Sequence, residues 1–227
     1  MLLTPPIYYY PSPLEAEEIT CNTIVIDGPE KLIIDPGLLS RWPELEARLA
    51  ADGFEPGGFK LALLTHSHRD HREAAEFLAR DYGLPLVLHE AELAFMRSRG
   101  QDPGFFSPLK EGPFLFAGRS FFLYHAPGHS PGSLVLHWPE AGLLVTGDVY
   151  FSRTFGATDR IGGNEAEMFE SLARLEKLPD VSLVLSGHGP VLSGRPAIED
   201  NYTALRREIA LKKAGLWGKI QTSPKTV

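Results

Sequence analysis

The sequence is poor in cysteine, in long apolar runs and in positive charge. One cysteine, Cys21, occurs among 227 residues, so an intrachain disulfide is excluded and a reducing compartment fits. No apolar run approaches the roughly 18 residues that a membrane span needs. The first six residues lack the basic region and apolar stretch of a signal peptide. We therefore expect a cytoplasmic protein without a membrane partner.

The charge balance bears on the class of partner. The formal net charge is −7, so nucleic acid is not an expected partner and a small-molecule substrate is favoured. Hydrophobic residues make up 43% of the chain, which is enough for a sizeable core. We expect a single domain over residues 1–227, whose oligomeric state the sequence does not indicate.

Apolar runs and turn residues predict a mixed α/β chain. Residues 22–35 read as a β-hairpin with its turn at 27–30. Continuous apolar runs predict further strands, which we place at 61–65, 84–89, 121–125, 133–138, 142–146 and 181–185.

Apolar residues at helical spacing predict the helices. They fall at 44–51, after residue 71 as far as Gly83, at 90–97, at 165–177 and at about 197–213. Residues 98–113 are rich in Gly, Pro and Ser and predict a long loop that could cover a site, although its role is not readable. The tail from about Gly215 has a weak pattern and is expected to fray. Because each half is strand-rich and then helical, the expected fold is an αββα sandwich.

A dense cluster of metal-binding side chains follows the predicted strand 61–65. The run H-x-H-x-D-H contains His66, His68, Asp70 and His71. In extended backbone, alternation places His66 and His68 on one side, where they can bind one ion together. Asp70 and His71 fall where the next helix begins, so they can face a second ion.

Three later residues complete two sets of ligands. His129, Asp148 and His188 each lie at a strand end framed by Gly or Pro, which lets the backbone turn sharply. His129 joins the first pair, His188 joins the second pair, and the Asp148 carboxylate can bridge both ions. The expected cofactors are two divalent ions, zinc first, with iron and manganese as alternatives. A hydroxide bridging them would attack the substrate, with Asp148 and Asp70 as the catalytic carboxylates.

These motifs resemble the metallo-β-lactamase superfamily over about residues 20–190. The match comprises Asp35, the segment 65–71, His129, Asp148 and His188. The resemblance implies the αββα fold and the ligand set His66, His68, Asp70, His71, His129, Asp148 and His188. It also implies that Asp35 is structural and not normally a ligand.

Within the superfamily, the segments 147–151, 156–159, 178–180 and 187–190 most resemble glyoxalase II-like hydrolases, such as hydroxyacylglutathione hydrolase. Ala157 stands where these relatives often carry a basic residue that helps to hold glutathione, which argues against a glutathione thioester. The expected activity is therefore hydrolysis of a small ester, thioester or lactone. The alternatives are a mononuclear iron persulfide dioxygenase, whose relatives use the equivalents of His66, His129 and Asp148, and an RNA-processing nuclease.

Two residues are candidates for substrate contact. Arg69 lies in a variable position of the H-x-H-x-D-H run, and its guanidinium suits an anionic substrate, although an exposed surface arginine is the simpler interpretation. Tyr150 follows the bridging Asp148 and could shape the pocket or pack in the core. The histidines His89, His125 and His137 match no motif and are expected to be structural or surface residues.

Overall fold

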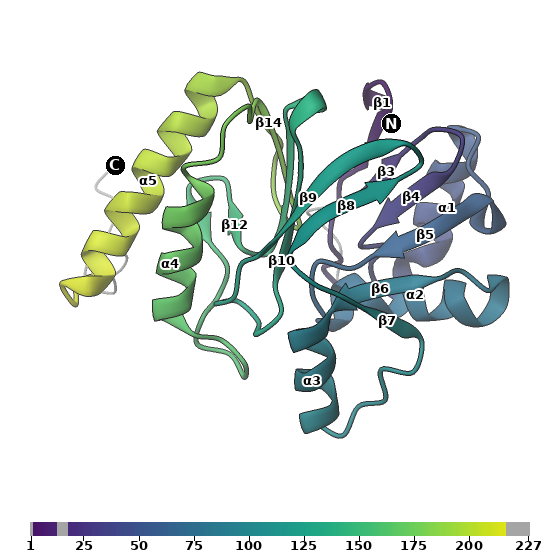
Figure 1. The fold of residues 1–227 in the computed structure, drawn as a ribbon, viewed down its shortest axis with the longest axis horizontal. Coiled ribbons are helices and arrows are strands. Elements are labelled where there is room, and N and C mark those ends of the chain that lie inside the picture. Colours follow the sequence, from purple (N-terminus) through teal and green to yellow (C-terminus); the bar gives the residue numbers. More distant parts are fainter. Residues whose placement is uncertain (1, 13–17, 217–227) are drawn as a thin grey trace.

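The computed structural model describes residues 2–12 and 18–216, and two β-sheets face each other at its centre (Figure 1). One sheet has the strand order β1-β2-β3-β4-β5-β6-β7, and the second has the order β15-β14-β11-β10-β9-β8. The strands of the first sheet are β1 (Leu2–Thr4), β2 (Ile7–Tyr10), β3 (Thr23–Ile26), β4 (Lys31–Ile34), β5 (Phe59–Leu63), β6 (Leu86–His89) and β7 (Phe106–Leu109).

The second sheet and a small ribbon follow in the sequence. The strands of the second sheet are β8 (Gly112–Phe116), β9 (Arg119–His125), β10 (Leu134–Trp138), β11 (Leu143–Gly147), β14 (Leu183–Ser186) and β15 (Leu192–Ser193). A two-stranded ribbon of β12 (Tyr150–Phe151) and β13 (Thr154–Phe155) lies beyond β11.

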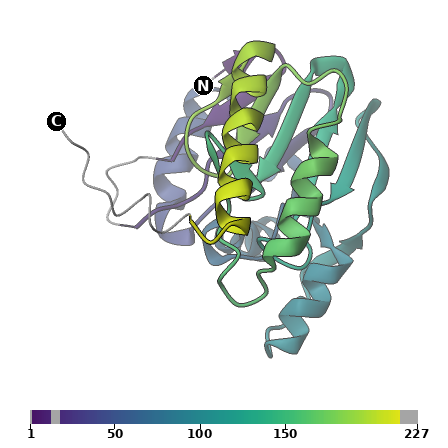
Figure 2. The ribbon, with the colours of Figure 1, turned by 90° about the vertical axis from the view of Figure 1, so that its left-hand side faces the viewer.

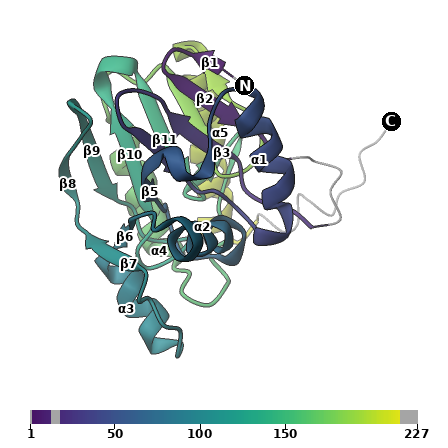
Figure 3. The same ribbon diagram turned by 90° about the vertical axis from the view of Figure 1, so that its right-hand side faces the viewer.

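Helices cover the outer face of each sheet. Helices α1 (Trp42–Ala51) and α2 (Arg69–Tyr82) lie on the first sheet (Figure 3), and α4 (Glu165–Leu175) and α5 (Arg195–Lys213) lie side by side on the second (Figure 2). Helix α3 (Glu90–Ser98) projects from the end of the first sheet. This is the expected αββα sandwich. The last helix covers the predicted range of about 197–213, and the tail from residue 217 lies outside the described residues.

Strand alternation separates the core into layers. In β3, Ile24 and Ile26 pack between the two sheets, whereas Val25 packs under the helices of the first sheet. In β10, Leu134 and Leu136 enter the same central layer, and Val135 packs under α4 and α5. The continuous apolar runs therefore mark strands that are covered on both faces.

The hairpin predicted over residues 22–35 is confirmed, because β3 and β4 pair antiparallel. The prediction of one loop over residues 98–113 is wrong in its second half. Strand β7 pairs in parallel with β6 at the edge of the first sheet, and β8 begins at Gly112. Pro108 lies within β7, and an edge strand tolerates proline because one side of its backbone needs no partner. None of the helices within the described residues combines the length and the apolar character that a membrane crossing requires.

Candidate metal centre

The predicted ligands come from the ends of strands in both sheets. His66 and His68 lie between β5 and α2, and Asp70 and His71 belong to the first turn of α2. The other three predicted ligands follow strands of the second sheet. They are His129 after β9, Asp148 after β11 and His188 after β14.

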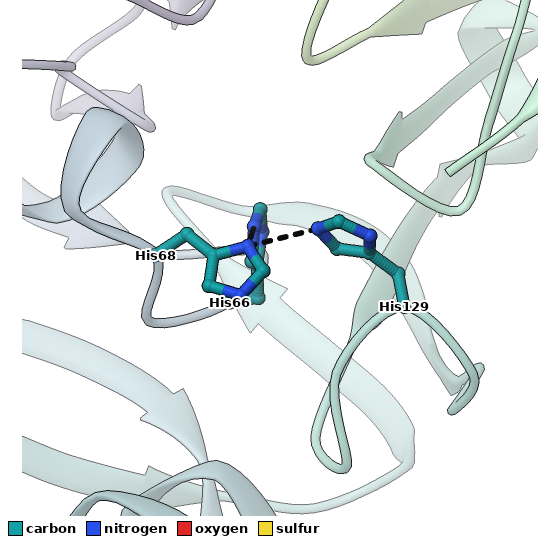
Figure 4. A group of neighbouring side chains, drawn as sticks. All are labelled: His66, His68 and His129. Atoms are coloured by element: carbon teal, nitrogen blue, oxygen red, sulfur yellow. Dashed lines mark hydrogen bonds between the residues drawn. The ribbon is translucent and has the colours of Figure 1, made fainter. Parts of the chain in front are cut away.

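Three histidine rings converge at one end of the site. Nδ1 of His68 lies 2.9 Å from Nε2 of His66 and 2.9 Å from Nε2 of His129 (Figure 4). One donor atom from each ring lies within 4.8 Å of the others, so the three form one potential metal-binding group. We call these residues, His66, His68 and His129, the three-histidine group.

A second group lies beside the first. Donor atoms of Asp70, His71 and His188 lie within 4.8 Å of one another, and Nε2 of His188 is 3.2 Å from Oδ2 of Asp70. We call these three residues the mixed group. The structure thus brings together the two ligand sets that the sequence predicts.

Asp148 lies between the two groups. Its Oδ1 is 3.3 Å from Nε2 of His71, and its Oδ2 is 3.5 Å from Nε2 of both His129 and His188. One carboxylate oxygen therefore faces both groups, as a bridging ligand requires.

Buried polar atoms provide a test of whether a metal fits. Nε2 of His71 and Oδ1 of Asp148 are buried 3.3 Å apart, and neither forms a hydrogen bond of good geometry with the other or with another described residue. Leaving buried polar atoms unsatisfied costs about 1–3 kcal/mol each. Both atoms are common metal donors, so divalent ions fit this donor set and would satisfy both atoms.

The ligands are oriented by a second layer of contacts. Asp35 accepts hydrogen bonds from the Thr65 amide at 2.8 Å, the Thr65 hydroxyl at 2.6 Å and Nδ1 of His71 at 2.8 Å. It lies behind the ligands, in agreement with a structural role. Nδ1 of His129 lies 2.9 Å from the carbonyl oxygen of Ala157, which fixes that ring as well.

Two further residues hold the ligand loops in place but belong to no recognisable sequence motif. Glu92 of α3 is fully buried and bonds to Ser67 and Gly132, in the two loops that carry the three-histidine group. The Asn22 side-chain amide donates to the carbonyl oxygens of Ser186 and Gly189 at 2.9 and 3.0 Å, on either side of His188. A charged residue beside Leu93 on the buried face of a predicted helix was the available signal for Glu92.

The two groups differ in their affinity for protons. Burial lowers the pKa of all three rings of the three-histidine group, and that of His68 falls to about 4. For His188, burial also favours the neutral ring, but hydrogen bonds to Asp148 and Asp70 outweigh it and raise the pKa to about 9. His71 behaves in the same way, since burial is outweighed by negative groups that include Asp148 and Asp35, and its pKa is raised.

A cavity of about 1040 Å³ opens onto the metal centre. Phe151 and Pro190 contribute apolar wall, and Arg160 contributes a cation. The predicted loop 98–113 lines no part of this cavity within the described residues.

The prediction that Tyr150 contacts substrate is wrong. Its side chain has 0% exposure and its hydroxyl lies 3.2 Å from that of Tyr202 on α5. Since neighbours in a strand point to opposite sides, the next residue, Phe151, faces the cavity instead. Arg69 is exposed and forms ion pairs with Glu18 and Glu73, so it lies outside this cavity, in agreement with the simpler interpretation.

Comparison with known proteins places the chain in a family. Residues 17–188 match the family described as "Metallo-beta-lactamase superfamily". The chain is 33% identical to the "Probable metallo-hydrolase YqgX" of Bacillus subtilis, over 73% of this chain and 83% of that one. It is 30% identical to "Hydroxyacylglutathione hydrolase GloC" of Haemophilus influenzae, over 78% of this chain and 88% of that one.

A solved structure adds the fold of a relative with metal bound. The di-iron-bound form of TTHA1623 superposes with a TM-score of 0.65 at 32% identity, covering 76% of this chain and 89% of that one. The family match over residues 17–188 includes every predicted ligand from His66 to His188. This chain therefore belongs to the metallo-beta-lactamase superfamily and is a metal-dependent hydrolase.

Proposed function

We propose that this hydrolase is binuclear, uses zinc, and cleaves a small ester, thioester or lactone. The observation that carries the proposal is the position of Asp148, whose carboxylate faces both the three-histidine group and the mixed group. Bound divalent ions would supply Lewis-acid activation of water and of the substrate carbonyl.

The chain's own residues would bind the substrate and accept a proton from the attacking water. The apolar wall at Phe151 and Pro190 suits the hydrocarbon part of an acyl group. Asp70 lines the cavity, and its pKa is lowered, because burial is outweighed by a hydrogen bond from His188 and the charge of His71. Its carboxylate is therefore ionised near neutral pH and able to accept a proton from the attacking water.

Two features bear on the acyl group and on the alternative reaction. Ala157 lines the cavity without a charge, which supports a substrate other than the glutathione thioester that relatives named hydroxyacylglutathione hydrolase act on.

The mononuclear dioxygenase would need only His66, His129 and Asp148. The convergence of Asp70, His71 and His188 favours a second ion instead.

The test is replacement of Asp148 by alanine. We expect Asp148→Ala to reduce bound metal, measured by elemental analysis, and to lower turnover of activated thioesters on the order of a hundredfold or more. Asp200→Ala is the matched control, because Asp200 is an exposed carboxylate that pairs with Arg153 and does not line the cavity at the metal centre. An Asp148→Ala protein that keeps two ions and its turnover would overturn the proposal. A single iron per chain, with oxygen consumed in the presence of a persulfide, would assign the dioxygenase reaction.

A further inference from the structure

A second cavity adjoins the metal centre and is rich in arginine. It encloses about 510 Å³ and shares His68 and Arg160 with the first cavity, so the two are continuous at a metal ligand. Its walls carry four guanidinium groups, from Arg69, Arg72, Arg99 and Arg160. We call these four residues the arginine cleft.

Two of the four arginines are paired with carboxylates. Arg69 forms ion pairs with Glu18 and Glu73, and Arg72 forms an ion pair with Glu76 at 3.1 Å.

Arg99 and Arg160 differ in this respect. Neither forms an ion pair or a side-chain hydrogen bond with any residue in the described ranges 2–12 and 18–216. One carboxylate, that of Asp159, lines the same cleft without pairing to either. The cleft therefore presents free guanidinium groups next to the site of chemistry.

Guanidinium groups select for particular anions. Their planar donors match the oxygens of phosphate and carboxylate, and two such groups lining one cleft can bind the same anion. The neighbouring cavity offers apolar wall at Phe151 and Pro190 for an acyl chain, with the ligand cluster between. A molecule that spans both cavities would place an anionic end in the cleft and a carbonyl beside His68.

We propose that the arginine cleft is a subsite for the phosphate end of a small acyl thioester or ester, held chiefly by Arg99 and Arg160. This rests on the proposed hydrolase function and names its substrate class. The net charge of −7 disfavours a long polyanion, so the phosphate belongs to a small molecule.

A matched pair of substrates tests the subsite. S-acetylpantetheine and S-acetyl-4′-phosphopantetheine carry the same thioester and differ by one phosphate. We expect the metal-loaded enzyme to prefer the phosphorylated compound in kcat/KM by roughly fivefold at low salt, as two exposed ion pairs allow. The preference should shrink as salt is added.

The double variant Arg99→Ala/Arg160→Ala should abolish the preference through KM. Arg99→Ala alone should reduce the preference and leave turnover of S-acetylpantetheine unchanged, because Arg99 does not line the cavity over the metal centre. Arg97→Ala is the matched control, since Arg97 is exposed in the last turn of α3, two residues before Arg99, and does not line the cleft. Equal use of the two substrates by the unaltered enzyme, or a preference that survives the double variant, would overturn the subsite while leaving the hydrolase intact.

Binding without turnover separates the two proposals. Calorimetric titration of the metal-loaded protein with phosphopantetheine and with pantetheine compares the same thiol with and without phosphate. Tighter binding of phosphopantetheine that depends on Arg99 and Arg160 would support the subsite even if neither thioester is cleaved. Equal binding would refute it. A single-stranded RNA that binds more tightly than phosphopantetheine through the same two residues would assign the cleft to nucleic acid and overturn the small-molecule assignment.

Discussion

At the scale of single residues, the metal centre is divided by proton affinity. The three-histidine group is held neutral by burial, so its nitrogens are free to bind metal at neutral pH. The mixed group faces carboxylates that favour the charged rings of His71 and His188. The raised pKa of each ring favours its protonated form in the metal-free protein, so metal binding at the mixed group competes with protons.

This difference predicts that the number of metal ions bound per chain depends on pH. The pKa of His188 is raised to about 9, so each pH unit below 9 should weaken metal binding at the mixed group by about tenfold or more. Binding at the three-histidine group should depend much less on pH from 6 to 9, because burial lowers the pKa of all three rings. Metal analysis after dialysis at limiting zinc should give about one ion per chain at pH 6 and two at pH 9. A parallel loss of both ions on acidification would refute this assignment.

The buried tyrosine pair gives a second prediction. Tyr150→Phe removes the hydrogen bond to Tyr202 and should lower the free energy of unfolding by about 0.5–1.5 kcal/mol, with kcat/KM unchanged. The adjacent variant Phe151→Ala should raise KM for an acyl substrate, because Phe151 lines the cavity. Thermal unfolding and steady-state kinetics measure the two effects. Raised KM in Tyr150→Phe would show that the hydroxyl reaches substrate after all.

At the scale of elements, α3 connects the two loops that carry the three-histidine group. The Glu92 carboxylate accepts bonds from the Ser67 amide at 3.0 Å and the Ser67 hydroxyl at 2.6 Å. Its other oxygen accepts from the Gly132 amide at 2.7 Å. Ser67 lies between His66 and His68, and Gly132 is close to His129. One helix thus sets the distance between ligands that come from different sheets.

Replacing this carboxylate by an amide should loosen the ligands. In Glu92→Gln one oxygen becomes an NH₂ donor that faces another donor, at a cost of about 1–3 kcal/mol. Metal affinity of the three-histidine group should fall by roughly tenfold to a hundredfold, as for other residues that orient ligands. Glu90→Gln is the control, because Glu90 belongs to the same helix and pairs at the surface with Lys110. Unchanged zinc affinity in Glu92→Gln would contradict this role.

Local sequence patterns predict most of the strands and helices and all seven ligands. The hairpin, the apolar strands and the helices were predictable because periodicity and turn residues are local signals. Strand β7 was missed because Pro108 and its flanking Gly and Ser residues are typical of loops, and only long-range pairing with β6 makes it a strand. The ligands were found through the H-x-H-x-D-H run and the Gly-framed turns. Glu92 and Arg160 belong to no such motif, since their roles depend on which distant loops the fold brings to them.

At the scale of the whole molecule, the metal centre joins the two layers. The first sheet and α2 contribute His66, His68, Asp70 and His71, and the second sheet contributes His129, Asp148 and His188. Backbone hydrogen bonds also join the two sheets along this boundary, which we call the seam. The Leu134 amide donates to the Thr65 carbonyl at 2.9 Å, and the Asn22 amide donates to the Gly187 carbonyl at 2.7 Å. Ions bound at this centre would therefore hold together the two sheets, whose outer helices pack in separate clusters.

Metal removal should destabilise the seam more than the outer layers. Ions that bind only the folded state contribute about 4 kcal/mol per site at a thousandfold excess over Kd. Chelation should lower the thermal unfolding temperature and speed hydrogen exchange in the loops 126–133 and 186–190. Exchange in α1, which packs on the outer face of the first sheet, should change little. A chelated protein that unfolds at the same temperature as the loaded one would rule out this coupling.

The spread of the ligands along the chain has a kinetic consequence. His66 and His188 lie 122 positions apart, so the centre closes only through contacts of long sequence separation, which form late in folding. Before the two sheets dock, the H-x-H-x-D-H run is the one group of ligands that lie close together in the sequence, and an ion held by that run alone would remain exchangeable. We therefore expect metal selectivity to be decided after the two sheets have docked, by the geometry of the complete site and by the ions available at that time.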